Sequence, residues 1–166
     1  LSVAILPLPG GEFYHYGTTH EILSSTLAIQ NTVNDQREIM HHSRKAHPSM
    51  FVQNAVLDIS LTDKNHNIWI ENSHVGKHWN LSHDNVITGV PENDWQINLM
   101  PGQCVDIVPV GESEYAVRPY GYDDKFRGNI NDIATLFLGI PFMEWMTSRF
   151  TDLPCIAGSQ DLQSAK

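Results

Sequence analysis

Three short stretches of the sequence hold the residues that could do chemistry. HVGKHWNLSHDNVITGV, residues 74–90, contains three of the nine histidines, and histidine can bind a metal ion or act as a general base. RPYGYDDKFRG, residues 118–128, sets three of the ten basic residues beside two aspartates, a combination that can hold phosphate and sugar hydroxyls. PENDW, residues 91–95, sets amide and carboxylate groups beside an aromatic face, which suits a pyranose ring. The elements that carry these stretches decide what each can reach.

A six-residue repeat of apolar side chains runs through the middle of the chain. Counting every sixth residue from Phe51 reaches eleven positions: Phe51, Leu57, Asp63, Trp69, Val75, Leu81, Ile87, Asn93, Leu99, Val105 and Gly111. Eight of the eleven are apolar. Such a repeat is typical of a left-handed parallel β-helix, in which three hexads make one coil and neighbouring coils lie ~4.8 Å apart. The apolar residue of each hexad points inward and is buried between coils. We therefore predict a mainly β fold with a β-helix-like domain over residues 51–128.

The repeat bears directly on the three histidines. Residues in neighbouring coils stack at intervals of eighteen, which places His83 over Asn65 and His78 over Ser60. The three histidines then occupy different positions within their hexads, so they do not converge on one point. Surface histidines are the favoured interpretation, and we expect no metal site in this chain. A β-helical acyltransferase, with His83 or His78 as its general base, is a less favoured alternative, because it requires more uninterrupted hexads.

Before the coils, residues 1–34 predict short strands and a helix. SVAILPL and EFYHY are typical of short strands joined by a Pro-Gly-Gly turn, and a helix follows over residues 19–32. Thr18 and Glu21 form a capping-box pattern at the start of that helix. Residues 35–50 are a polar connector, in which we expect three solvated histidines: His41, His42 and His47.

After the coils, residues 97–121 predict an antiparallel hairpin or a last irregular coil, with a turn at Gly111–Ser113. Residues 129–150 predict a helical cap. Pro141 suits the first turn of its helix, and three side chains are expected to face inward: Phe142, Trp145 and Met146. Residues 151–166 are polar and typical of a tail.

Composition excludes several classes of partner. Ten basic and nineteen acidic residues give a net charge of −9, which repels the nucleic-acid backbone and anionic membranes. No apolar run approaches the ~18 residues that span a bilayer, and the N-terminal stretch lacks the charged start of a signal peptide. The two cysteines, Cys104 and Cys155, have no motif spacing and are typical of reduced thiols, so we expect a cytoplasmic protein. The chain starts at Leu1 in a strand-like run, which suggests a piece of a larger protein.

Several stretches carry a resemblance to known enzymes. FYHYGTTHE resembles the closing strand and turn of nucleotide-sugar pyrophosphorylases, which implies that residues 1–34 are the end of a nucleotidyltransferase core. Five more stretches resemble the fucose-1-phosphate guanylyltransferase (GDP-fucose pyrophosphorylase) family, above all its bifunctional bacterial members that also carry an L-fucokinase: FVQNAV, ENSHVG, ITGVPENDW, RPYGYDDKFRG and GIPFMEW. The resemblance runs from about Glu12 to Phe150. It implies formation of GDP-L-fucose and pyrophosphate from GTP and β-L-fucose 1-phosphate, with a divalent metal such as Mg²⁺.

The resemblance also implies what lies outside this chain. The Gly-rich nucleotide loop of such enzymes has no counterpart here, and neither has their carboxyl-terminal sugar kinase domain. The chain would be a middle segment of a larger enzyme, inactive alone. Its expected partners are those missing domains, with GTP and fucose 1-phosphate as substrates of the whole enzyme, and a second copy of the chain is a further candidate partner.

Site residues follow from the resemblance. Related pyrophosphorylases have a metal-binding Asp at the position of His15, and histidine is a poor Mg²⁺ ligand, so we expect His15 to contact sugar or phosphate, or the metal to lie elsewhere. Gly17 and Thr18 could bind an anion at the helix start, although a plain helix cap explains them equally well. Contacts to the sugar phosphate are expected from eight further residues: Asn93, Asp94, Trp95, Arg118, Tyr120, Asp123, Asp124 and Arg127.

Each group of site residues also has a structural alternative. Residues 118–127 could form a solvated, salt-bridged loop, and residues 93–95 could form a turn that Trp95 anchors in the core. The whole coil domain could likewise be a purely structural module that packs domains or subunits together and touches no substrate.

Overall fold

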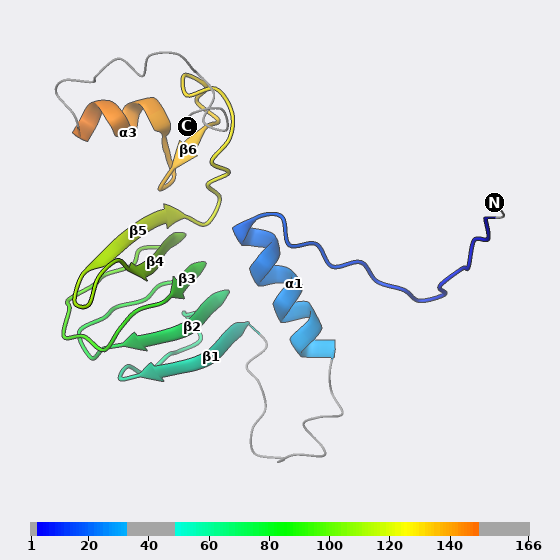
Figure 1. Ribbon diagram of the computed structural model, residues 1–166, viewed down its shortest axis with the longest axis horizontal. Coiled ribbons are helices and arrows are strands. Elements are labelled where there is room, and N and C mark those ends of the chain that lie inside the picture. Colours follow the sequence, from blue (N-terminus) through cyan, green and yellow to red (C-terminus); the bar gives the residue numbers. More distant parts are fainter. Residues whose placement is uncertain (1–2, 33–48, 150–166) are drawn as a thin grey trace.

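The computed structural model describes residues 3–32 and 49–149. Its helices and strands, in chain order, are α1 (Thr19–Thr32), β1 (Met50–Leu57), β2 (Ile68–Val75), β3 (Asn85–Thr88), β4 (Gln103–Pro109), β5 (Tyr115–Gly121), β6 (Leu136–Phe137), β7 (Ile140–Pro141) and α3 (Phe142–Arg149) (Figure 1). The connector histidines His41, His42 and His47, together with Cys155 and the polar tail, lie outside the described residues. No helix among the described residues is long and apolar enough to span a membrane.

Five strands form one sheet in the order β1-β2-β3-β4-β5, and consecutive strands from β1 to β4 are parallel. Partners are eighteen residues apart between β1 and β2, as in Met50 with Ile68, and seventeen apart between β2 and β3, as in Ile68 with Asn85. The spacing returns to eighteen between β3 and β4, where Ile87 lies opposite Val105. Parallel neighbours so close in sequence require the chain to complete a coil between them. The predicted β-helix-like fold is therefore confirmed as a β-solenoid of about three coils.

The interior of the solenoid is a continuous apolar core. Its fully buried side chains include Ile68, Ile70 and Ile87, which come from adjacent strands. Burying a side chain of this size is worth ~1.5–3 kcal/mol relative to exposure, so the core holds the coils together. Five members of the six-residue repeat lie in it, as predicted: Val75, Leu81, Ile87, Leu99 and Val105.

Two members of the same repeat, Phe51 and Trp69, lie on the other face of the sheet, contrary to prediction. They pack in a separate apolar cluster against α1. The reason is a column of left-handed residues at one corner, with φ angles of +48°, +49° and +69°: Asn54, Asn72 and Gly89. Such a residue takes one position out of the strand alternation, so side chains six apart on either side of it point to opposite faces.

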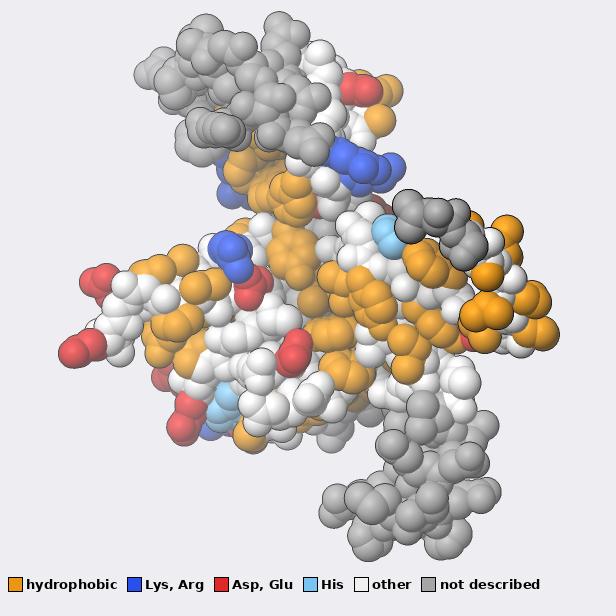
Figure 2. All heavy atoms as spheres, turned by 45° about the vertical axis from the view of Figure 1, so that its right-hand side comes forward, with side chains coloured by type: hydrophobic (Ala, Val, Ile, Leu, Met, Phe, Trp, Pro, Cys, Tyr) orange, Lys and Arg blue, Asp and Glu red, His pale blue; other side chains and the backbone are white. Residues whose placement is uncertain are grey.

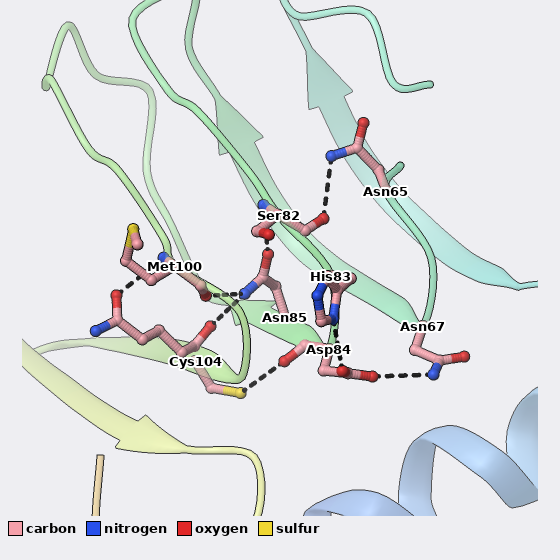
Figure 3. Close-up of polar contacts among 9 residues, drawn as sticks. Asn65, Asn67, Ser82, His83, Asp84, Asn85, Met100 and Cys104 are labelled. Atoms are coloured by element: carbon pink, nitrogen blue, oxygen red, sulfur yellow. Dashed lines mark hydrogen bonds and ion pairs between the residues drawn. The ribbon is translucent and has the colours of Figure 1, made fainter. Parts of the chain in front are cut away.

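Side-chain amides connect successive coils at the corners. Three such hydrogen bonds have lengths of 2.6, 2.9 and 2.8 Å: Asn54 to Asn72, Asn67 to Asp84, and Asn80 to Asn98. Asn85 is fully buried, and its Oδ1 accepts from the Ser82 N–H at 2.9 Å (Figure 3). Its Nδ2 donates to the carbonyls of Met100 and Gln103 at 3.0 and 2.8 Å. The buried amide of Asn85 is therefore satisfied by the backbone of its own coil and of the next one.

The seventeen-residue step corrects the predicted position of His83. Its ring stacks on that of His66, with centroids 4.7 Å apart and an interplanar angle of 11°, and not over Asn65. The eighteen-residue spacing fails here because the coil between β2 and β3 is one residue shorter than its neighbours.

α1 begins and ends where the sequence predicts. The Thr18 hydroxyl accepts from the Glu21 N–H at 3.2 Å, and the Glu21 carboxylate accepts from the Gly17 N–H at 3.0 Å. The first bond satisfies a backbone donor of the first helical turn, and the second satisfies the Gly17 N–H, one residue before the N-cap Thr18, so the pair forms a variant of the predicted capping box.

The strands predicted over SVAILPL and EFYHY are absent from residues 3–16 of the described chain. This segment runs away from the sheet (Figure 1), and its apolar side chains Val3, Ile5, Leu6 and Leu8 are between 81% and 92% exposed. Figure 2 shows hydrophobic side chains gathered on the surface at that side of the molecule. A strand needs a neighbour for its backbone hydrogen bonds, and no described segment pairs with this one.

The chain beyond β4 combines both predicted forms. β4 is the last parallel strand of the solenoid, and it also pairs with β5 as an antiparallel hairpin. The helical cap predicted over residues 129–150 is wrong in part, because β6 and β7 form a two-stranded hairpin before α3. Its turn residues Leu138 and Gly139 have φ angles of +54° and +78°, the combination that closes two-residue hairpins. Pro141 ends β7 and directly precedes α3, and does not lie within its first turn.

Candidate functional site

The outer face of the sheet carries two parallel rows of side chains. The apolar row lies under α1 and consists of Phe51, Trp69, Val86, Cys104 and Tyr120. The polar row consists of Gln53, Glu71, Thr88, Asp106 and Arg118. Each of these residues is two positions from the apolar-row residue of its strand, later in the sequence on β1 to β4 and earlier on the antiparallel β5. Alternate residues of a strand share a face, so both rows face outward. α1 packs on the apolar row, and a pocket lies at the β4–β5 end of the polar row.

This pocket, here called the Arg118 pocket, has a volume of about 500 Å³ and is lined by Thr88, Asp106, Arg118, Pro119, Tyr120 and Phe126. Thr88 donates to one carboxylate oxygen of Asp106 at 2.8 Å, and the other oxygen accepts from the Arg118 guanidinium. The ion pair holds Arg118 in place, yet 63% of its side chain stays exposed, so the guanidinium can still meet a ligand. Guanidinium groups bind phosphate through paired N–H donors, so the pocket can hold an anion.

Aromatic side chains form the other wall of the Arg118 pocket. Burial raises the pKa of the Tyr120 phenol, and the Asp106 carboxylate raises it further, so the phenol stays protonated and able to donate. Phe126 has a φ of +48°, which is rare for a bulky residue, and half of its side chain is exposed. Its ring lies 6.4 Å from that of Tyr120 and 6.2 Å from that of Phe137. The pocket is therefore polar on one wall and aromatic on the other.

A second pocket lies where the start of α1 meets the loop after β5. This helix-start pocket has a volume of about 240 Å³ and is lined by Thr18, His20, Glu21, Tyr122, Asp123, Asp124 and Lys125. It brings together residues that lie about a hundred positions apart in the sequence. Thr18, Asp123 and Asp124, all predicted as site residues, meet here, whereas Arg118 and Tyr120 line the Arg118 pocket. Arg127 is exposed and lines neither pocket.

The remaining residues predicted near the helix start contact Glu21. The His15 Nδ1 lies 3.0 Å from its carboxylate, and the Gly17 N–H donates to the same oxygen. His15, followed by Thr18 and Gly17, lowers the pKa of Glu21. Because the folded pKa is depressed, these contacts stabilise the helix start above the ordinary Glu pKa and are lost as the pH falls through the lowered value. Glu21 thus already contacts the Gly17 N–H and the His15 ring, two groups that a bound anion would need.

Asn93 and Trp95 serve the fold. The Asn93 Oδ1 accepts from the Trp79 indole at 3.0 Å and from the Trp95 N–H at 3.1 Å. Its Nδ2 donates to the carbonyls of His74 and Pro91 at 2.9 and 2.7 Å, which fills the hydrogen-bonding capacity of the amide. Trp95 packs against the main core, whereas Asp94 is exposed. The structure does not bring these residues to the Arg118 pocket or to the helix-start pocket.

The three central histidines lie in separate environments. The His74 Nε2 is 2.7 Å from Asp58, the His83 Nδ1 is 2.7 Å from Asp84, and His78 is exposed. In the part of the chain that the structure describes, no group of three or more His, Cys, Asp or Glu residues is placed to hold a metal ion.

Several pocket residues are missing from the sequence-based prediction. Thr88, Asp106 and Phe126 line the Arg118 pocket, and His20 and Glu21 line the helix-start pocket. A signal for Asp106 existed: a hairpin whose turn is centred at Gly111–Ser113 pairs Asp106 with Arg118, as the register shows. Thr88 had a signal too: the eighteen-residue stacking interval places it beside Asp106, as the register of β3 and β4 shows.

Coils, a covering helix and outward-facing pockets define this chain as a β-solenoid domain. Among curated proteins, it is similar to the L-fucokinase/L-fucose-1-P guanylyltransferase of Bacteroides fragilis, with 55% identity over 167 residues. The alignment covers 99% of this chain and 17% of the relative, so the chain corresponds to one segment of that bifunctional enzyme. This likeness confirms the resemblance inferred from the sequence motifs. No protein-family model and no solved structure matches the chain.

Proposed function

We propose that the chain is a segment of a cytoplasmic enzyme that makes GDP-L-fucose from GTP and β-L-fucose 1-phosphate, in fucose salvage. In that enzyme the β-solenoid is a scaffold, and its outer face contributes contacts to the sugar phosphate. The observation that carries the proposal is the Arg118 pocket, which combines a guanidinium, a phenol and a carboxylate with an aromatic wall. The 55% identity to a segment of a fucokinase/guanylyltransferase supports the choice of substrate.

The chemistry of the pocket fits a sugar phosphate in three respects. Arg118 offers charge-assisted donors to the phosphate. Asp106 and Tyr120 offer an acceptor and a donor to ring hydroxyls. Phe126 and Tyr120 offer aromatic faces to the apolar side of a 6-deoxy sugar. The nucleotide, the Mg²⁺ ion and the residues that promote the reaction belong to other parts of the enzyme in this proposal.

Kinetics of Arg118→Ala in the full-length enzyme test the proposal. Loss of one charge-assisted contact to phosphate costs ~1.5–3 kcal/mol, so we expect KM for fucose 1-phosphate to rise by about 10- to 100-fold. The melting temperature should stay close to that of the wild type, because the Arg118 side chain is mostly exposed. Arg149→Ala, the same substitution at an exposed arginine of α3, is the matched control and should leave KM unchanged.

A purely structural module is the second candidate function, and the saturated amide of Asn93 favours it for residues 93–95. It predicts that Arg118→Ala and Asp94→Ala act only through stability. A lowered melting temperature with unchanged KM in the Arg118 variant would favour this candidate over a substrate contact.

A further inference from the structure

Asp124 is a buried carboxylate that forms no ion pair within the part of the chain that the structure describes. The residue is 6% exposed, and the hydrogen bonds that its carboxylate accepts within the described residues come from backbone N–H groups. Burying a charged group is costly unless hydrogen bonds compensate it. The hydrogen bonds of Asp124 therefore decide what this buried carboxylate does in a loop beside two pockets.

One oxygen of Asp124 joins two segments of the chain. Its Oδ2 accepts from the Gly121 N–H at 2.6 Å, where β5 ends, and from the Leu138 N–H at 2.9 Å, in the turn of the β6–β7 hairpin. The Asp124 N–H also donates to the Gly121 carbonyl at 3.1 Å, which closes the turn. The carboxylate is thus the link between the end of the solenoid sheet and the hairpin that lies beyond β5 (Figure 1).

The other oxygen of Asp124 packs tightly against the backbone. A Cβ on Gly121 would lie 2.6 Å from Oδ1, so a glycine is required for the carboxylate to lie there. Within residues 3–32 and 49–149, Oδ1 is buried and has no hydrogen-bond partner. An unsatisfied buried acceptor costs stability. The unpaired Oδ1 therefore destabilises the loop, whereas the two hydrogen bonds to Oδ2 fix the position of the loop.

The loop that Asp124 fixes supplies residues to both pockets. Asp123 and Lys125, its sequence neighbours, line the helix-start pocket, and Phe126 lines the Arg118 pocket. Phe126 is held at a φ of +48°, a conformation that a bulky side chain adopts only when its surroundings impose it. Its ring contacts Phe137, which belongs to the same hairpin that Asp124 holds.

We propose that Asp124 is the positioning residue that fixes the loop of residues 122–126 against the β6–β7 hairpin, and so sets the aromatic wall of the Arg118 pocket. The assignment of a substrate to that pocket rests on the proposed function. Asp124 itself acts on the substrate only through Phe126 and its neighbours.

Amide hydrogen exchange in the full-length protein tests the anchor without any substrate. In the wild type, the Gly121 and Leu138 amides are expected to exchange slowly, because both donate to a buried oxygen. Asp124→Ala should speed both by about 10-fold or more, since their shared acceptor is gone. Asp124→Asn keeps one acceptor oxygen in the same place and should exchange like the wild type. Unchanged exchange at both amides in the alanine variant would overturn the anchor.

Kinetics of the same variants test the positioning role. We expect Asp124→Ala to raise KM for fucose 1-phosphate by about 10-fold while kcat stays within about threefold, and Asp124→Asn to restore KM. Asp63→Ala, at an exposed aspartate in a distant turn, is the control for the substitution itself.

If the alanine protein does not fold, Gly121→Ala displaces the carboxylate sterically and should raise KM in the same way. Faster exchange with an unchanged KM would overturn the positioning role, if Arg118→Ala does raise KM. If Arg118→Ala leaves KM unchanged, the proposed function fails, and the exchange result still decides the anchor.

Discussion

Cys104 shows how the covering helix determines the chemistry of a single residue. Its thiol is 1% exposed, lies in the apolar row under α1 and contacts the carbonyl of Asp84 at 3.8 Å. Burial raises the pKa of the thiol to about 12, and nearby carboxylates add to the shift. The thiolate is the reactive form, so this cysteine should be inert in the folded protein.

Alkylation kinetics check this prediction. At about pH 8, the raised pKa lowers the thiolate fraction of Cys104 by about 1,000-fold relative to an ordinary cysteine, and burial slows the reagent further. We expect the peptide containing Cys104 to remain unmodified in the native protein and to be labelled rapidly in denaturant, as measured by mass spectrometry. Labelling at similar rates in both states would show that α1 does not cover the sheet as described.

At the scale of elements, the corners of the solenoid combine left-handed backbone with close approach between coils. Gly89 and Gly102 both occupy corners, with φ angles of +69° and +72°. A Cβ on Gly89 would lie 2.2 Å from the Ile107 carbonyl oxygen of the next coil, whereas a Cβ on Gly102 would meet nothing closer than 3.9 Å. A side chain at Gly102 would therefore destabilise the fold only through the left-handed backbone. A side chain at Gly89 would add a clash with the next coil.

Alanine substitution at these two corners gives the element-scale prediction. Gly102→Ala should lower the free energy of unfolding by about 1 kcal/mol, the cost of a left-handed alanine. Gly89→Ala should lower it by about 3 kcal/mol or more, because the clash with a backbone carbonyl adds to that cost. Chemical denaturation of both variants measures the difference. Equal losses would mean that the coils are not packed at the Gly89 corner.

The sequence reveals elements whose signals are local. The capping pair Thr18 and Glu21 located the start of α1, and the hexads from Val75 onward located the core. The sequence did not predict the short coil before β3 or the left-handed Asn72, because each depends on how the corner packs against the next coil. The hydrogen bonds of Asn93 were not predicted either, because they also depend on packing between coils.

The candidate site shows the same limit of prediction. Arg118, Tyr120 and Asp123 stand out in the sequence because basic, aromatic and acidic residues lie close together in the short stretch 118–127. Their division between two pockets does not follow from the sequence, because it depends on where α1 and the β6–β7 hairpin lie on the solenoid. Whether these residues contact a substrate stays a prediction.

At the scale of the whole molecule, the charge distribution bears on substrate binding. The net charge of −9 repels an anionic sugar phosphate over most of the surface, yet three of the ten basic residues lie within residues 118–127. The chain spans 17% of the length of the curated relative that it matches. The outer face of the solenoid is therefore where we expect this segment to meet the substrate of a larger enzyme.

The most direct test is a structure of the full-length enzyme with bound fucose 1-phosphate. The account predicts the phosphate within hydrogen-bonding distance of the Arg118 guanidinium and the sugar ring against Phe126 or Tyr120. Clear density for fucose 1-phosphate in the guanylyltransferase site, with no atom of this β-solenoid in contact with it, would contradict the account and leave the chain a scaffold.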